Sequence, residues 1–282
     1  MKTLFLLFAS AALLSAEELK PAALPAQSTC TDGSCQIRFD GTKQLALDFP
    51  LKLKPGNWYR IQFDARSRKG AGADRFLSAL RFGGRNRYQA FQANTAWSRH
   101  VNFFYAQEAD GQYSLILKRS QAGPDTVEFR KIRCTGLDDA DFRRNLFPDG
   151  DFESGDPAVP SFPWRKGGTA EVTDCGFLTG EYSLVLRNLR SPHSAPYMIS
   201  ATLPVRRGKP YRLALWVKAN GNGSVCLTFE TLRKEIPVSG EWQKIEWRFT
   251  TPADFPRMAR LMIRMQHELR TLMLDCVSFS EQ

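Results

Sequence analysis

Hydrophobic and polar side chains alternate one by one along several stretches of the chain. In one stretch Tyr59, Ile61 and Phe63 are separated by polar residues, and residues 113–118 and 211–217 repeat this pattern. A period of two places one set of side chains in a core and the other set on the opposite face of a sheet. Short segments rich in Gly, Asn, Asp and Pro separate the stretches, as in tight turns between antiparallel strands. The pattern predicts an all-β protein made of antiparallel sandwiches.

The two halves of the chain carry this pattern twice, in the same order. A repeat of this length is a whole domain and not a short solenoid unit. We therefore expect two tandem copies of one fold. The aligned segments are 33–39 with 180–186, 51–65 with 203–217, and 127–132 with 272–277.

The N-terminus is typical of an export signal. Lys2 precedes an apolar run from Leu4 to Leu14, and Ser15 and Ala16 are small residues suited to cleavage. The run is too short for a membrane span, which needs about 20 apolar residues. We expect cleavage after Ala16 and a secreted, periplasmic or cell-surface protein without a membrane-spanning segment.

These patterns divide the chain into five parts. Asp138, Asp139 and Asp141 are placed to begin a short helical turn between the two copies. The expected parts are a signal peptide over 1–16, an irregular lead-in over 17–32, a first and shortened sandwich domain over 33–136, a linker over 137–144, and a second sandwich domain over 145–282.

Charge and cysteine content restrict the partners and the compartment. Lys and Arg number 39 against 29 Asp and Glu, a net charge of +10 that is spread over both halves. A dispersed excess is typical of a solvated surface, and it also favours an anionic partner such as an acidic polysaccharide. No nucleic-acid motif is present, so we expect no nucleic-acid partner. The 6 Cys permit disulfides in an exported chain. A bridge from Cys30 or Cys35 to Cys134 would tie the ends of the first domain, but the spacing does not define the pairing.

Several segments of the second half carry a family resemblance. In order they are NLFPDGDFESG from residue 145, Trp164, GEYSLVL from 180, GKPYRLALWVKA from 208, Trp242 and LMLDCVSF from 272. This series resembles the jelly-roll carbohydrate-binding modules that accompany xylanases and cellulases, within the wider galactose-binding-like sandwiches. The resemblance covers 145–282, and 33–136 looks like a divergent copy without the opening motif. It implies jelly-roll domains that bind glycan on a sheet face or at loops.

The resemblance also implies a structural calcium ion near the ends of the second domain. Glu153, the backbone around Gly180, and Asp275 match the usual positions, and calcium prefers carboxylate and carbonyl oxygens. The alternative is that both carboxylates are ordinary surface groups. In the first copy Arg130 and Lys131 align with Asp275 and its neighbour, so we expect at most one calcium per chain. Arg130 would take the place of the cation if it pairs with a carboxylate.

A glycan site requires an aromatic platform with a few polar groups around it. Alternation along the second copy places Arg212, Trp216 and Lys218 on one sheet face, and the two cations would favour acidic sugars. Trp164 is a further candidate. The alternatives are that Trp216 packs under a loop and that Trp164 anchors a loop or the core. The matching face of the first copy carries Arg60, Gln62, Asp64 and Arg66 without an aromatic residue, so we expect weaker glycan binding there or none.

Catalytic signatures are missing from the sequence. It contains no GxSxG, HExxH, P-loop or dinucleotide motif, and its 3 His lie far apart. Both halves are already assigned to sandwiches, which leaves no residues for a separate catalytic domain. We therefore expect a non-catalytic exported carbohydrate-binding protein. The alternatives are a structural or adhesive surface protein whose sandwiches no longer bind sugar, and a hydrolase that uses unrecognised carboxylates.

Overall fold

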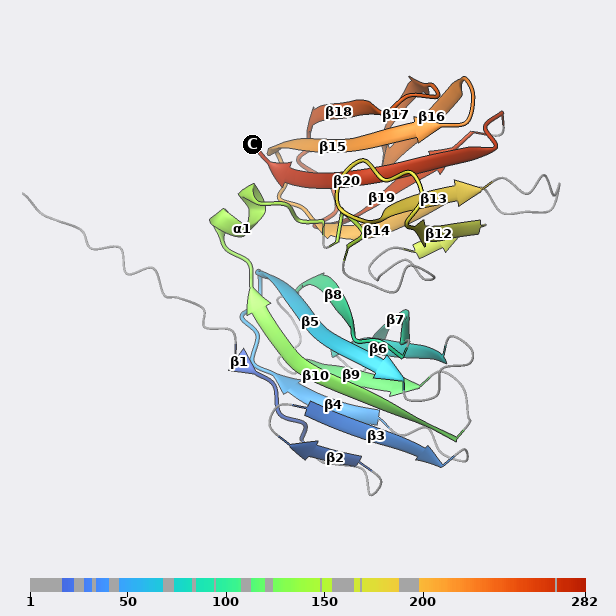
Figure 1. Cartoon of the computed structure of the whole chain (residues 1–282). Helices are drawn as coiled ribbons and strands as arrows, with labels where there is room; N and C mark the ends of the chain where they lie inside the picture. Colours follow the sequence, from blue (N-terminus) through green and yellow to red (C-terminus); the bar gives the residue numbers. More distant parts are fainter. Residues whose placement is uncertain are drawn as a thin grey trace, which may run out of the picture.

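Two β-sandwiches follow one another along the chain, with the N-terminal sandwich below the C-terminal one in Figure 1. The structure is a computed structural model. It describes residues 17–22, 28–31, 34–40, 46–67, 74–82, 85–93, 95–107, 113–119, 124–147, 149–153, 165–167, 169–187, 198–266 and 268–282. Every strand pair is antiparallel, as the alternation predicts, so the all-β tandem-sandwich prediction is confirmed. The predicted signal peptide, 1–16, lies outside the described residues.

The N-terminal sandwich consists of a larger and a smaller sheet. The larger sheet is ordered β2 (Ser28–Thr31), β3 (Ser34–Asp40), β10 (Pro124–Gly136), β5 (Trp58–Ser67) and β8 (Ser98–Tyr105), and β1 (Glu17–Glu18) also pairs with β10. The smaller sheet is ordered β4 (Ala46–Leu51), β9 (Tyr113–Arg119), β6 (Asp74–Phe82) and β7 (Arg85–Ala93). The core between them contains Phe49, Phe63 and Phe129, which are at most 1% exposed.

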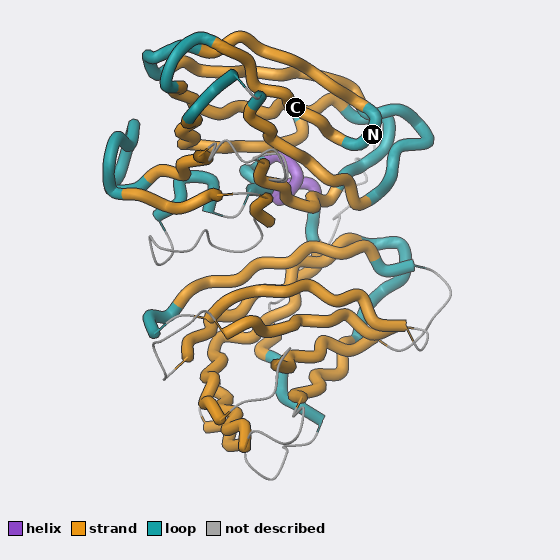
Figure 2. Tube along the Cα trace, turned by 90° about the vertical axis from the view of Figure 1, so that its right-hand side faces the viewer, coloured by secondary structure: helices purple, strands orange, loops and turns teal. Residues whose placement is uncertain are grey.

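The C-terminal sandwich consists of two sheets of five strands. One is ordered β12 (Thr169–Thr173), β13 (Ser183–Arg187), β20 (Thr271–Glu281), β15 (Pro210–Ala219) and β18 (Gln243–Thr250). The other is ordered β11 (Arg165–Gly167), β14 (Met198–Pro204), β19 (Met258–Met265), β16 (Gly223–Phe229) and β17 (Leu232–Val238). Tyr211, Phe229 and Phe279 lie close together in its core, and the Tyr211 and Phe279 rings are stacked with centroids 4.9 Å apart. Figure 2 shows the two sandwiches from the side.

The repeat seen in the sequence extends to individual hydrogen bonds. Tyr59 and Tyr211 each accept a hydrogen bond from the backbone N–H five residues earlier, at Lys54 (2.7 Å) and at Arg206 (2.8 Å). The intervening turn passes through a left-handed glycine in both copies, with φ of 81° at Gly56 and 66° at Gly208. The two halves therefore enter their central strands, β5 and β15, in the same way.

The last strand of each sandwich contains a bulge at the same aligned position. The pairing of β10 with β5 shifts register between Arg130 and Arg133, and the pairing of β20 with β15 shifts next to Asp275. Lys131 and Cys276 are left-handed there, with φ of 53° and 49°. A bulge changes the direction of the neighbouring side chains, and here it does so in both copies.

The N-terminal segment is more ordered than the sequence suggests. The expected irregular lead-in, 17–32, contains strands β1 and β2, which extend the larger sheet. A disulfide joins Cys30 to Cys35 across the β2–β3 hairpin, and Cys134 is a free thiol, so the bridge considered for Cys134 is not formed. Burial raises the pKa of Cys134 to about 12, which keeps this thiol protonated and unreactive at neutral pH.

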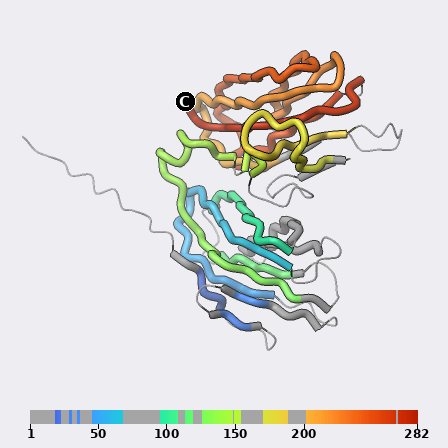
Figure 3. The backbone as a smooth tube through the Cα atoms, in the orientation of Figure 1, coloured from blue at the N-terminus to red at the C-terminus, as the bar shows by residue number. Residues whose placement is uncertain are grey.

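A short helix connects the sandwiches. Helix α1 (Asp139–Arg143) begins at the N-cap Asp138, whose side chain accepts from the Asp141 N–H while Asp141 caps in return. Its Phe142 is 1% exposed and belongs to the C-terminal core. The predicted helical turn between the copies is confirmed, and Figure 3 shows the chain passing through it from one sandwich to the other. None of the helices in the described residues is long and apolar enough to cross a membrane.

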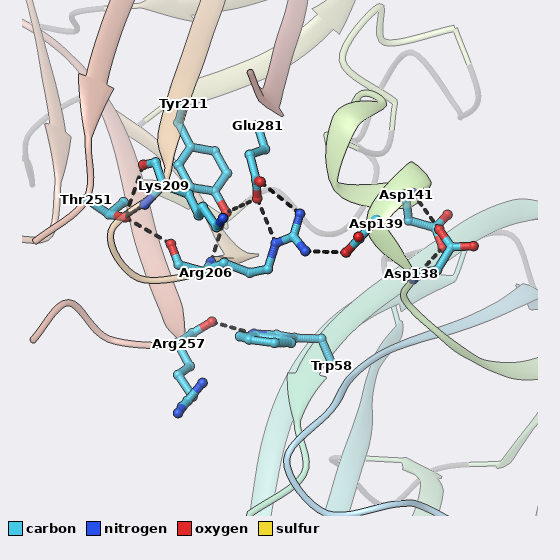
Figure 4. A network of polar contacts seen from close by, with 10 residues as sticks. All are labelled: Trp58, Asp138, Asp139, Asp141, Arg206, Lys209, Tyr211, Thr251, Arg257 and Glu281. Atoms are coloured by element: carbon cyan, nitrogen blue, oxygen red, sulfur yellow. Dashed lines mark hydrogen bonds and ion pairs between the residues drawn. The ribbon is translucent and has the colours of Figure 1, made fainter. Parts of the chain in front are cut away.

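Side chains of both sandwiches meet beside this helix (Figure 4). Trp58 Nε1 donates to the Arg257 carbonyl oxygen at 2.9 Å, and the Arg257 guanidinium lies 4.6 Å from the Tyr105 ring centroid. Arg206 pairs with Glu281 at 2.7 Å and also contacts Asp139 of α1. Trp58 packs edge-on against Phe142, so the connection between the halves is apolar in its centre and polar around it.

Candidate functional site

The outer face of strand β15 carries the three residues that the sequence predicts for sugar binding. Arg212, Trp216 and Lys218 are half-buried and face away from the core, whereas Leu213 and Leu215, which alternate with them, are 0% exposed. The structure therefore places all three on one sheet face, with a large aromatic surface between two cationic groups. Trp164 lies outside the described residues.

The two cations on this face differ in their partners. Arg212 forms an ion pair with Glu246 of the neighbouring strand β18 at 2.9 Å, and Arg248 binds the same carboxylate at 2.7 Å. The hydrogen bond from Arg248 has the largest effect on the pKa of Glu246 and lowers it below its usual value, and the hydrogen bond from Arg212 acts in the same direction. Within the described residues Lys218 has no ion-pair partner. Lys218 therefore keeps more of its charge available to a ligand than Arg212 does.

A loop crosses the sheet next to Trp216. Asp275 lies opposite Trp216 in the β15–β20 register and is 0% exposed, because its carboxylate accepts from the Leu178 and Thr179 N–H groups at 2.9 and 3.2 Å. Two residues before Leu178, a Cβ built on Gly176 would lie 2.7 Å from the side chain of Met273, which is opposite Lys218, so this backbone lies close to Met273. The loop 174–180 is thereby fixed on the outer face of β20, one strand away from β15.

Phe177 lies at the tip of this loop, between the two fixed points. It is 43% exposed, the one large hydrophobic side chain with such exposure in the part of the chain that the structure describes. Phe177 is therefore an exposed aromatic residue on a loop that is held on β20, the strand adjacent to β15. The sequence analysis missed Phe177. The sequence does contain a signal for it: Phe177 is a large apolar residue in a turn segment, directly before the repeat at 180–186.

The expected calcium residues converge on the same loop. Glu153 Oε1 accepts from the Glu181 and Tyr182 N–H groups at 2.9 Å each, while Asp275 binds the loop two residues before Gly180. Gly180 has a φ of 72°, and a Cβ built there would lie 2.3 Å from Glu153 Oε1, so the carboxylate and this backbone are in close contact. Glu153 and Asp275 thus hold both ends of one short segment.

The carboxylate of Asp275, which binds this loop, would suit a hard cation such as calcium. The buried Asp275 carboxylate accepts from three backbone N–H groups and from the Cys276 thiol, and no cationic side chain pairs with it among the described residues. A buried carboxylate without a countercharge is costly, and a calcium ion would offset it. No group of three or more His, Cys, Asp or Glu with metal-binding geometry occurs in the described residues, so backbone carbonyl oxygens would have to complete the ligand set.

The first sandwich carries the cation Arg130 at the position that aligns with Asp275, as the sequence indicates. Arg130 pairs with Asp64 at 3.2 Å, which confirms the pairing of Arg130 with a carboxylate. The expectation that this face lacks an aromatic residue is wrong, because Trp97 lies on it, 4.1 Å from the Arg130 guanidinium. Trp97 precedes strand β8 and reaches this face only through the pairing of β8 with β5, so alternation along β5 alone does not reveal it.

A scan of protein-family models and a search of curated proteins find no match to the chain. A search of solved structures finds the N-terminal CBM22-1–CBM22-2 tandem domain of Paenibacillus barcinonensis Xyn10C. The match has 17% sequence identity and a TM-score of 0.37, and it covers 95% of this chain and 93% of that one. A second is the family 16 carbohydrate-binding module-2, with 14% identity over 49% of this chain and 100% of that one, and a TM-score of 0.38.

Proposed function

We propose that this protein is an exported, non-catalytic carbohydrate-binding protein whose second sandwich binds polysaccharide. One observation carries the proposal: the half-buried Trp216 lies on an outer sheet face with Lys218 and Arg212, and the exposed Phe177 belongs to the loop that is held on the adjacent strand β20. Sugars bind to aromatic surfaces through their C–H faces, and a few placed polar groups then select the hydroxyl or acid groups. Lys218 favours acidic sugars because its charge has no carboxylate partner among the described residues.

The test measures binding after removal of the aromatic platform. In affinity electrophoresis on neutral and acidic polysaccharides, Trp216→Ala should weaken retardation about tenfold or more, because a large stacking surface is lost. Trp216→Phe keeps a ring and should retain most of the binding. Unchanged binding in Trp216→Ala would contradict the assignment of this face. If no glycan on an array binds the unmodified protein, the structural or adhesive alternative is favoured.

The absence of catalysis is part of the same proposal. Incubation with each polysaccharide that binds should release no reducing sugar above the blank. Release that grows with time and protein concentration would favour the hydrolase alternative and would direct attention to paired carboxylates.

We further propose one structural calcium ion between Glu153 and Asp275 beside Gly180. Its support is the buried Asp275 carboxylate, which has no countercharge among the described residues. Calcium should raise the melting temperature of the protein relative to EDTA, because an ion that binds the folded state stabilises it. Calorimetry should find one site, and Asp275→Asn should remove it. Two equal sites, or no thermal shift in the unmodified protein, would contradict the proposal.

Export with cleavage after Ala16 is proposed as well. Strand β1 begins at Glu17, where it pairs with Cys134 of β10, so cleavage at this point would leave the sheet edge intact. N-terminal sequencing of protein recovered outside the cytoplasm should begin at Glu17. A mature N-terminus beyond Glu18 would remove β1 and contradict this cleavage site.

A further inference from the structure

The outer face of the larger N-terminal sheet carries ordered rows of charged side chains. At one level of the sheet Glu128 of β10 lies opposite Arg66 of β5, and Trp97 directly precedes β8, which pairs with β5 up to Ser98. Arg66 forms an ion pair with Glu128, whose other oxygen accepts from Gln36 of β3 at 2.7 Å. This first row therefore crosses three strands, β3, β10 and β5, and ends at Trp97, whose ring lies 4.6 Å from the Arg66 guanidinium.

The second row is centred on a buried carboxylate. Arg130 of β10, Asp64 of β5 and Arg99 of β8 lie opposite one another. Asp64 is 6% exposed and lies 3.2 Å from Arg130 Nε and 3.4 Å from Arg99 Nε. Lys131, turned by the bulge, adds a third cation at 3.8 Å from the same carboxylate. Three cations thus share one anion.

The cations of the two rows outnumber their carboxylates. Four described cationic groups face two described carboxylates, and both carboxylates are buried. The side chains of Arg99 and Lys131 remain 57% and 54% exposed. The surface that solvent meets is therefore positive, while the anions lie beneath it.

The arginine groups in these rows are held in place before any ligand binds. The guanidinium carbons of Arg130 and Arg66 lie 4.1 and 4.6 Å from the centroid of the Trp97 ring. Cation–π contacts of this kind fix a guanidinium plane while its N–H groups remain available. A ligand that binds fixed donors loses less conformational entropy than one that has to order flexible side chains.

This cluster is separate from the contact between the sandwiches. Trp58, at the start of β5, lies in that contact, whereas Asp64 and Arg66 lie six to eight residues further along the same strand. At about 3.3 Å per residue the separation is roughly 20–26 Å. The C-terminal sandwich therefore covers one end of this sheet face, and the cluster lies at the other end.

We propose that Arg66, Arg99, Arg130 and Lys131, arranged around Trp97 and Asp64, form a second binding site that takes the carboxylate or sulfate groups of an acidic polysaccharide. The polysaccharide class of the ligand rests on the proposed function. The site does not depend on the Trp216 face, because it lies on the other sandwich. Arg99 and Arg130 stand on β8 and β10, two strand spacings or about 10 Å apart, so a linear polyanion can contact both at once.

The experiment compares retardation of the full protein in gels that contain polygalacturonate, dextran sulfate or neutral dextran. The double variant Arg99→Gln/Lys131→Asn should lose about tenfold in affinity for at least one acidic polymer, as expected when charge-assisted hydrogen bonds are removed. Asn tolerates the left-handed backbone at position 131. Loss on polygalacturonate alone would identify carboxylate as the ligand group, and loss on dextran sulfate alone would identify sulfate.

The matched control is Arg233→Gln/Arg270→Gln, which removes the same charge from exposed positions on the other sandwich. Arg233 has the same 57% exposed side chain as Arg99. Equal weakening in both double variants would show that net charge alone attracts the polymer and would overturn the site. Unchanged affinity in Arg99→Gln/Lys131→Asn with native thermal unfolding would overturn it too.

Trp216→Ala separates the two proposals. In a protein that carries Trp216→Ala, the added change Arg99→Gln/Lys131→Asn should weaken binding to the acidic polymer by the same factor as in the unmodified protein. This result is expected whether or not the Trp216 face binds a glycan. A stronger effect of Arg99→Gln/Lys131→Asn on short duplex DNA or on phosphatidylglycerol vesicles than on either polysaccharide would reject the polysaccharide as the ligand.

Discussion

His100 shows how burial decides the charge of a single residue. Its side chain lies on the inner face of β8 and is 2% exposed, its ring stacks on Phe63 with centroids 5.3 Å apart, and its Nε2 lies 3.0 Å from the Ser98 hydroxyl. Loss of solvation lowers the pKa of His100 to about 3, although Asp64 acts in the opposite direction. The folded protein therefore keeps this imidazole neutral at any pH at which the protein is normally handled.

This burial makes stability depend on pH between about 6.5 and 3. The unfolded chain binds a proton at His100 below pH 6.5, and the folded chain does not until about pH 3, so the free energy of unfolding falls as the pH falls through this range. Between pH 7 and pH 4 the loss from this one group should be on the order of 3 kcal/mol. Urea unfolding of the unmodified protein and of His100→Gln at both pH values measures it. An identical pH dependence in both would contradict the prediction.

The packing of elements depends on close backbone contacts at particular glycines. Gly150 O accepts from the Val277 N–H at 2.7 Å, and a Cβ built on Gly150 would lie 1.9 Å from Val277 O. Gly150→Ala should therefore separate this segment from β20 and lower the free energy of unfolding by several kcal/mol, as expected for strong overpacking. Gly208→Ala is the control, since its Cβ meets nothing within 4 Å and only its left-handed φ of 66° is strained. Equal melting temperatures in the two variants would refute this account.

The sequence could predict these elements but not their contacts across strands. Alternation and turn glycines were sufficient for β5, β15 and the repeat that relates them, because those signals are local. Trp97 joins the charged face only through the β5–β8 register, and the loop that carries Phe177 is held on β20 only by the buried Asp275. The Cys30–Cys35 disulfide could be predicted only if residues 28–31 were known to form a strand that pairs with β3. Each missed feature depends on which segments lie side by side, and composition and period do not specify this.

At the scale of the whole molecule, the two sandwiches share one apolar contact. Trp58 and Phe103 of the N-terminal sandwich pack against the C-terminal core, together with Phe142 of α1. Leu137 N–H donates to the Trp58 carbonyl at 2.9 Å, which fixes the connecting segment to the start of β5. This contact holds the sheet with the Arg130 cluster and the sheet with the Trp216 face in one arrangement, so both would present to the same polymer in a constant geometry.

Removal of the Trp58 ring should separate the unfolding of the two sandwiches. Trp58→Ala removes the indole that packs on Phe142 and the N–H that donates to the Arg257 carbonyl, so the halves lose their apolar contact while each keeps its own core. Calorimetry should then show two transitions, one for each sandwich, where a single transition is expected for the unmodified protein. Arg257→Gln is the milder comparison, since it removes the guanidinium above Tyr105 but keeps the carbonyl that accepts from Trp58. A single transition in Trp58→Ala, at a temperature lower for the whole molecule, would mean that the covalent connection through α1 is sufficient to couple the sandwiches.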